Sequence, residues 1–211
     1  MSRTLRSFLR GGRNARGYTA VELLMAISIF GVGVAGIISM EKVTSASNAH
    51  AKNLAIATHI AESWLDILQT DASTWNHPSP LDSKSDLQQT LWLKNVATNA
   101  NATSWFLPEW NSALSFGPAF DALGNPLNTA DLTGAAFCSH LRLSWLYPEN
   151  ASGNGLIRAE VRVFWLRDGQ ASPVANVNPC APGMPIASVT GATQVFHFVQ
   201  KITAVRENMT Q

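Results

Sequence analysis

The hydrophobic and polar positions divide the chain into three successive patterns. Residues 18 to 40 are apolar or small except for Glu22, residues 41 to 71 show apolar residues at helical spacing, and the last third alternates apolar and polar residues. A helix of 23 residues is about 35 Å long at about 1.5 Å per residue, and a membrane's hydrocarbon core is about 30 Å thick. The first pattern therefore predicts a membrane-spanning helix.

The second pattern predicts that this helix continues beyond the membrane as an amphipathic helix over residues 41 to 71. Its apolar stripe comprises Leu54, Ile56, Ala57, Ile60, Ala61, Trp64, Leu65, Ile67 and Leu68. A stripe of this width can pack on a sheet. Lys52, Glu62 and Asp66 fall outside it and are expected to face solvent. Turn formers and two prolines follow from Asp71, which ends the helix.

The third pattern predicts an antiparallel hairpin. Residues 141–147 and 157–165 alternate at strand spacing, and residues 148–155 between them are rich in turn formers. A mixed run over Val195–Arg206 is expected to add a strand after a loop over 168–193. The fold class is therefore α+β, with a long N-terminal helix packed on a small antiparallel sheet and one globular domain over residues 72–211.

The segment from about 82 to 133 is the least readable part of the chain. It is rich in Asn, Ser, Thr, Ala, Gly and Pro, and a short helix is expected near residues 86–96. Its aromatic residues are Trp92, Trp105, Phe106, Trp110, Phe116 and Phe120. They favour core packing of a loop-rich segment, and a stacking platform for a ligand is the alternative.

Charge gives the membrane helix an orientation. Five arginines and no acid precede it, at positions 3, 6, 10, 13 and 16. The positive-inside bias keeps them cytoplasmic and places the chain after Met40 on the far side. A charge at mid-bilayer costs about 2.5 to 3.5 kcal/mol, and less near the edge, so Glu22 is predicted to have a functional partner.

The segment Arg16-Gly17-Tyr18-Thr19-Ala20-Val21-Glu22-Leu23-Leu24 resembles the processing site of class III signal peptides, found in type IV prepilins and pseudopilins. The resemblance implies that a prepilin peptidase removes residues 1–17, cutting after Gly17, and methylates the new amine of Tyr18. Glu22 then stands at the fifth mature position. An ordinary secretory signal has its apolar core before the cut instead. A plain signal anchor with an accidental glutamate is the alternative.

Three features depart from the commonest prepilin pattern. Tyr18 stands where phenylalanine or methionine is more usual, Ala20 stands where leucine is common, and the proline often found in the middle of the span is absent. Gly31, Gly33 and Gly36 fall in the same half of the span. They either let the helix bend or unwind on assembly, because glycine lowers helix propensity, or they permit close helix packing.

The resemblance is greatest to PilV-type minor pilins, which implies a non-catalytic subunit that acts in initiation of the pilus or at its tip. The implied partners are prepilin peptidase, other major and minor pilins, the inner-membrane assembly platform and a tip adhesin. The implied location is the bacterial inner membrane before assembly, with a periplasmic C-terminal domain, and the pilus afterwards. A type II secretion pseudopilin is one alternative, and a membrane-anchored periplasmic enzyme, binding protein or adhesin is another.

Composition adds few chemical candidates. No nucleophile elbow, zinc-protease motif or phosphate loop occurs, which argues against an enzyme, and no cofactor is implied. The predicted leader contains five of the 15 basic residues and none of the 14 acidic ones, so the mature chain has 10 basic and 14 acidic residues. Nucleic-acid binding is therefore not predicted. His50 and His59 lack the spacing of a metal pair, and no metal site is expected.

The cysteines Cys138 and Cys180 both lie in the part predicted to be exported, where oxidation is permitted. A single disulfide is expected, and free thiols remain the alternative. In the pilin family a disulfide often bounds the C-terminal region, so the resemblance implies the same pairing.

Overall fold

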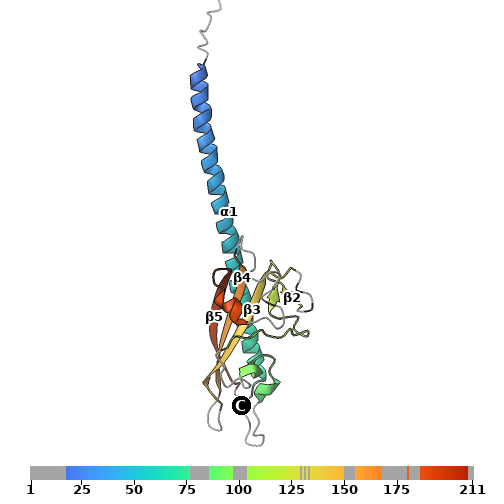
Figure 1. The fold of residues 1–211 in the computed structure, drawn as a ribbon. Coiled ribbons are helices and arrows are strands. Elements are labelled where there is room, and N and C mark those ends of the chain that lie inside the picture. The colour runs from blue at the N-terminus through green and yellow to red at the C-terminus, as the bar shows by residue number, and fades with distance from the viewer. Residues whose placement is uncertain are drawn as a thin grey trace, which may run out of the picture. The chain divides into compact units, whose positions relative to one another are not determined.

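The computed structural model describes residues 18–76, 86–96, 104–128, 130, 132, 134–149, 155–167, 180 and 186–208. Gly17 and the rest of the predicted leader, most of the hairpin turn and most of the loop around Cys180 lie outside the described residues. The chain divides into two compact units, Met1–Asn48 and Ala49–Gln211. The helix α1, Ala20–Asp71, contributes to both units (Figure 1).

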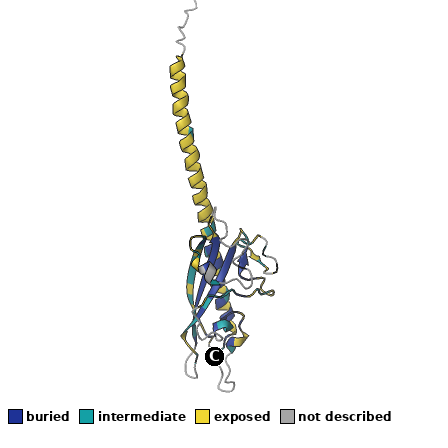
Figure 2. Cartoon of the chain, in the orientation of Figure 1, coloured by how far each residue is buried: buried dark blue, intermediate teal, exposed yellow. Residues whose placement is uncertain are grey.

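The described part of the first unit is the N-terminal portion of α1. Its residues are exposed throughout except for Val34, which is half-buried, as the uniform colour of this portion shows (Figure 2). Among the described residues α1 is the one helix long and apolar enough to cross a membrane. The prediction of a membrane-capable helix is confirmed, and so is its continuation to Asp71.

The second unit contains one five-stranded antiparallel sheet with strand order β2-β1-β3-β4-β5. The long strands are β3 (Phe137–Tyr147), β4 (Leu156–Leu166) and β5 (Phe196–Arg206). They confirm the predicted hairpin and the third strand. The short strands β1 (Ala119–Phe120) and β2 (Pro126–Leu127) were not predicted from the sequence. A short helix, α2, spans Ile186–Gly191.

Within the second unit, α1 packs on one face of the sheet. Its buried residues Ala57, Ile60, Ala61, Trp64 and Leu68 share a core with alternate residues of β3 and β4 (Figure 2). Lys52, Glu62 and Asp66 are exposed as predicted. The prediction for Leu54 was wrong, because this side chain is 42% exposed and lies before the first buried position of the helix, Ala57.

Three aromatic residues of the loop-rich segment, Trp92, Phe116 and Phe120, belong to this core. Trp64 of α1 contacts the rings of Trp92 and Phe116 edge-on, with ring centroids 5.3 and 4.8 Å apart. Trp92 is 2% exposed and Phe120 is also buried. Such edge-on pairs suit the charge distribution of aromatic rings. Core packing therefore describes Trp92, Phe116 and Phe120, whereas Trp105 and Trp110 are half-buried and lie outside this core.

A buried carboxylate fixes the loop-rich segment to the end of α1. Asp71 accepts hydrogen bonds from the backbone N–H groups of Leu91, Trp92 and Leu93, at 2.7, 2.9 and 3.1 Å. The helix expected over 86–96 is instead two 3-10 helices, Asp86–Gln89 and Leu93–Val96. One continuous helix does not form, because the three consecutive N–H groups at the break donate to the carboxylate of Asp71. In a continuous helix they would donate to backbone carbonyls of the preceding turn.

Replacing Asp71 with alanine should lower the free energy of unfolding of the second unit by on the order of 3 kcal/mol, because buried N–H groups left without an acceptor are costly. Urea unfolding of the full chain in detergent, followed by tryptophan fluorescence, measures the effect. Asp66→Ala is the matched control, since Asp66 is an exposed carboxylate on the same helix, and should change the value by less than about 0.5 kcal/mol. Equal effects of both substitutions would contradict this role of Asp71.

Candidate functional site

The first candidate site is the N-terminal end of α1, where Thr19 and Glu22 form a reciprocal capping box. The carbonyl of Thr19 accepts the first helical bond, from the N–H of Leu23 at 3.2 Å. The hydroxyl of Thr19 accepts the N–H of Glu22 at 3.2 Å, and the carboxylate of Glu22 accepts the N–H of Thr19 at 3.4 Å. Each residue thus satisfies a backbone donor that the start of a helix leaves open.

The sequence prediction singled out Glu22 but missed Thr19. The spacing Thr-x-x-Glu directly before an apolar run is the sequence signature of a capping box, so the signal was present. The box also gives Glu22 a role inside the single chain. Its negative charge lies in the first turn of the helix, where the helix dipole favours an anion.

Glu22 keeps capacity for a further partner. The described contacts of its carboxylate all involve Oε2, from the N–H and hydroxyl of Thr19 at 3.4 and 3.5 Å. The Oε1 atom can therefore accept a bond from a donor outside the chain. The side chain is exposed among apolar neighbours such as Val21 and Leu23, which are 65% and 59% exposed. An ammonium brought to this position would meet a carboxylate already held in place.

The three glycines of the predicted span have no packing role within the described chain. A Cβ atom added at Gly31, Gly33 or Gly36 would meet nothing within 4 Å, and α1 continues through them without a break. Their small size would matter only against a surface outside the chain or for a change of backbone conformation. Both interpretations of these residues stay predictions.

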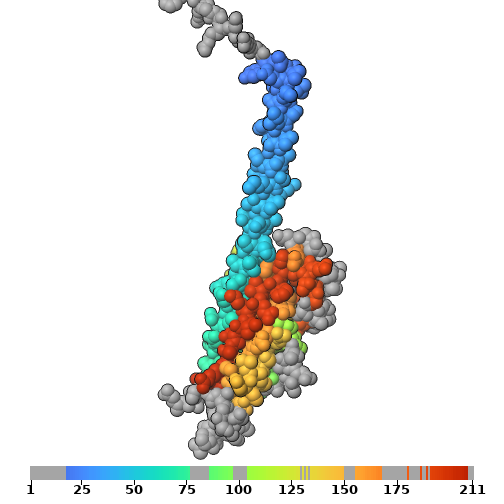
Figure 3. Space-filling model, turned by 90° about the vertical axis from the view of Figure 1, so that its left-hand side faces the viewer, coloured from blue at the N-terminus to red at the C-terminus, as the bar shows by residue number. Residues whose placement is uncertain are grey.

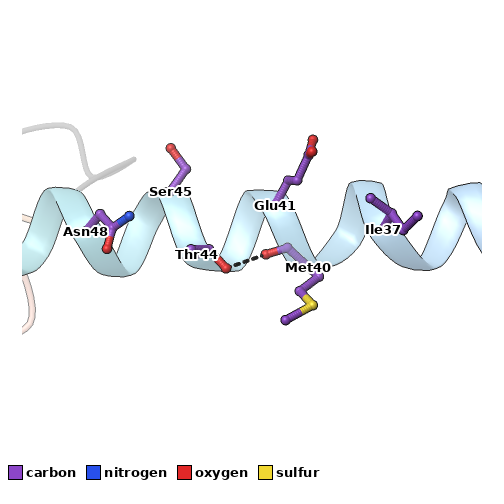
Figure 4. A pocket seen from close by; sticks show the side chains of 6 residues that line it. All are labelled: Ile37, Met40, Glu41, Thr44, Ser45 and Asn48. Carbon is purple, nitrogen blue, oxygen red and sulfur yellow. Dashed lines mark hydrogen bonds between the residues drawn. The ribbon is translucent and has the colours of Figure 1, made fainter.

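A shallow hollow lies on the same helix where the predicted span ends. All six residues that line it belong to α1, and they are Ile37, Met40, Glu41, Thr44, Ser45 and Asn48 (Figure 4). The hydroxyl of Thr44 donates to the carbonyl of Met40 at 2.9 Å, so it is satisfied within the helix. A hollow lined by one helix offers surface for another helix rather than a closed ligand cavity.

The second unit contains the predicted disulfide. Cys138 of β3 is bonded to Cys180, with a sulfur-to-sulfur distance of 2.04 Å. Both residues are buried and pack against Ala119 of β1. The bond therefore fixes Cys180 itself to the start of β3.

The comparisons with known proteins identify no relative. No protein-family model, curated protein or solved structure matches this chain. What the structure shows is a long N-terminal apolar helix, an antiparallel sheet packed on its C-terminal portion, and a disulfide. This architecture is pilin-like. The membrane-capable helix and the disulfide together indicate a membrane-anchored chain with an extracytoplasmic domain.

The remaining chemical candidates lie in the second unit of this pilin-like chain. A cavity between residues 91–95 and residues 106–109 is lined by Leu91, Trp92, Lys94, Asn95, Phe106, Leu107 and Glu109. The indole N–H of Trp92 donates to the carbonyl of Glu109 at 3.2 Å. Because Trp92 is 2% exposed, its ring face is not presented to a ligand.

The histidines do not form a metal centre in the described part of the chain. His50 and His59 are both exposed, and the ring of His50 lies against His197 and Trp165, with centroids 4.5 and 6.3 Å away. Among the described residues, no three His, Cys, Asp or Glu side chains are placed to hold one metal ion. His50 is thus a packing residue where α1 meets β4 and β5.

Proposed function

We propose that this chain is a minor type IV pilin, a non-catalytic subunit that enters the pilus through its N-terminal helix and acts in initiation or at the tip. The observation that carries the proposal is Glu22, an exposed carboxylate held by a capping box at the start of an apolar helix. It stands four residues after Tyr18, behind a basic leader that ends at Gly17. The pilin-like architecture supports the same role.

In the proposed mechanism, prepilin peptidase cuts after Gly17 and frees the amine of Tyr18. The apolar helix then packs against neighbouring helices, and the carboxylate of Glu22 pairs with the amine of an adjacent subunit. Both charges would otherwise be buried alone in an apolar bundle, at a cost of several kcal/mol. The pairing therefore selects one register and favours ordered addition, with Gly31, Gly33 and Gly36 allowing close approach or a local bend.

The proposed partners follow from this pathway. They are prepilin peptidase, other major and minor pilins, the inner-membrane assembly platform and a tip adhesin. Before assembly the chain would lie in the inner membrane of a bacterium, with its N-terminus in the cytoplasm and the second unit in the periplasm. A type II secretion pseudopilin is the second candidate, because it would share the processing site and the pairing of Glu22.

Deletion of the host's prepilin peptidase tests this proposal. The full chain should then keep residues 1–17, remain in the membrane fraction and be absent from filaments sheared off the cells. In the parent strain the shortened chain should be present in the sheared fraction, which separates a pilus from a secretion pseudopilus confined to the envelope. Immunoblotting of both fractions provides the measurement. An unchanged chain length after deletion would refute processing at Gly17.

A further inference from the structure

A cluster of charged and aromatic side chains occupies the face of the sheet opposite to α1. Residues of β4 such as Val161 and Val163 point into the core with α1, so the alternate residues point to the other face. The strand register brings Arg142 beside Glu160 and Glu160 beside Ile202. We call the cluster the arginine face, and it comprises Trp105, Arg142, Arg158, Glu160, Arg162, Phe198, Gln200 and Ile202.

A single buried carboxylate organises the arginine face. Glu160 is 2% exposed and pairs with Arg142 and with Arg158, the latter through Nε at 2.9 Å. The side-chain amide of Gln200 also donates to it at 2.8 Å. Arg162 instead donates to the amide oxygen of Gln200, at 3.2 and 2.7 Å. Two guanidinium groups thus pair with the carboxylate and a third is linked to it through Gln200, so three positive charges and one negative charge leave an excess of two.

The excess of positive charge contributes to a lowered pKa of one arginine in the cluster. Burial lowers the pKa of Arg162 below its ordinary value, the positive charge of Arg142 lowers it further, and Glu160 offsets only part of the effect. A second carboxylate brought to the arginine face would therefore meet a favourable field. A guanidinium can bind such a group through two parallel hydrogen bonds.

Aromatic rings hold two of these arginines in fixed positions. The guanidinium carbons of Arg142 and Arg162 lie 4.7 and 4.2 Å from the ring centroid of Trp105. Arg162 also lies 4.8 Å from the ring of Phe198. Cation–π contacts of this kind restrict long side chains, so part of the ordering cost of a polar interface is already met before binding.

The arginine face is accessible and is bordered by apolar surface. The side chain of Arg158 is 43% exposed, and Phe198 and Ile202 are 42% and 51% exposed. Both apolar residues come from β5, which lies at the edge of the sheet and at the molecular surface (Figure 3). Arginine and aromatic residues next to apolar surface are the composition that protein interfaces favour.

We propose that the arginine face binds an acidic segment of another protein subunit. Two excess charges are too few for the extended phosphate contacts of a nucleic acid, whereas Phe198 and Ile202 suit a peptide that carries apolar residues beside its carboxylate. The proposal is independent of the assembly role of Glu22, since it rests on side chains of the second unit alone.

Photocrosslinking tests the proposal in the native host, with the full chain carrying p-benzoylphenylalanine in place of Ile202. Adducts are digested and sequenced by mass spectrometry. The expected adduct is a peptide of another protein, or of a second copy, with Asp or Glu within about one turn of the attachment point. Arg158→Gln should reduce its yield at least fivefold. Lys201→Gln is the matched control, because Lys201 lies on the same strand but pairs with Glu62 of α1 on the opposite face.

A charge exchange completes the test. Replacing the identified acid of the partner with lysine should reduce the yield as Arg158→Gln does, and Arg158→Glu should restore it in that background. Formation of the Cys138–Cys180 disulfide on non-reducing gels verifies that each variant folds. The proposal is overturned if Ile202 yields no adduct, an adduct with lipid or nucleic acid, or a peptide without a nearby acid. It is also overturned if Arg158→Gln and the control Lys201→Gln give the same adduct yield.

Discussion

Glu22→Ala should exclude the chain from sheared filaments while leaving it cleaved and inserted in the membrane. The reason is that the amine of a neighbouring subunit would be buried in the helix bundle without its partner. At about 1.4 kcal/mol per tenfold change in an equilibrium constant, a loss of several kcal/mol reduces incorporation by well over tenfold. Quantitative immunoblotting of sheared and membrane fractions measures the ratio.

A defect of Glu22→Ala could come from the lost charge pairing or from the lost capping box. The variant Glu22→Gln separates these two interpretations. Glutamine can maintain the box with Thr19, because its amide oxygen still accepts the backbone N–H, but it carries no charge for the amine. Charge pairing predicts that Gln is as defective as Ala. Asp66→Ala, which removes an exposed carboxylate of the same helix, is the matched control and should be incorporated normally. Recovery of incorporation by Gln would mean that Glu22 acts through the helix cap alone.

Replacing both Cys138 and Cys180 with alanine should lower the free energy of unfolding of the second unit by about 4 kcal/mol. The cysteines are 42 residues apart, and in the chain-entropy model a closed loop of that length contributes between the roughly 3 kcal/mol of a 15-residue loop and the roughly 4.7 kcal/mol of a 100-residue loop. Both side chains are buried with Ala119, so loss of their packing adds to the effect. Denaturant unfolding of the full chain in detergent provides the value.

Two further variants serve as controls for this effect. The single variants Cys138→Ala and Cys180→Ala remove the bond as completely as the double variant and should be nearly as destabilised. Reduction of the wild-type chain should reproduce most of the loss without altering packing. If the free energy of unfolding of the double variant is within about 1 kcal/mol of that of the oxidised wild type, the bond contributes little to stability. That result would contradict a structural role of the disulfide.

The sequence predicted the elements whose signals are local and long. The apolar run and the helical stripe that ends at Asp71 each keep one pattern over more than 20 residues, and the strands β3 and β4 alternate over 141–147 and 157–165, whereas the run of β5 is mixed. The strands β1 and β2 have two residues each, too few to show a period. Thr19 was missed although its signal is local, because the interpretation of Glu22 considered partners outside the chain only.

The features that the sequence did not reveal depend on contacts between distant segments. Asp71 was interpreted as a turn former, yet its partners are the N–H groups of residues 91–93. Glu160 alternates with core residues along β4, and it is enclosed by Arg142, Arg158 and Gln200. No periodicity of β4 alone can show that a neighbouring strand supplies the groups that bury a carboxylate.

The most direct test of the account is the mass of the N-terminal peptide of the mature chain, isolated from the host's membranes or filaments. The proposed processing predicts a peptide that begins at Tyr18 and carries one methyl group on its amine. A mature chain that begins at Met1, or at a residue beyond Met40, would contradict the proposed assembly through Glu22.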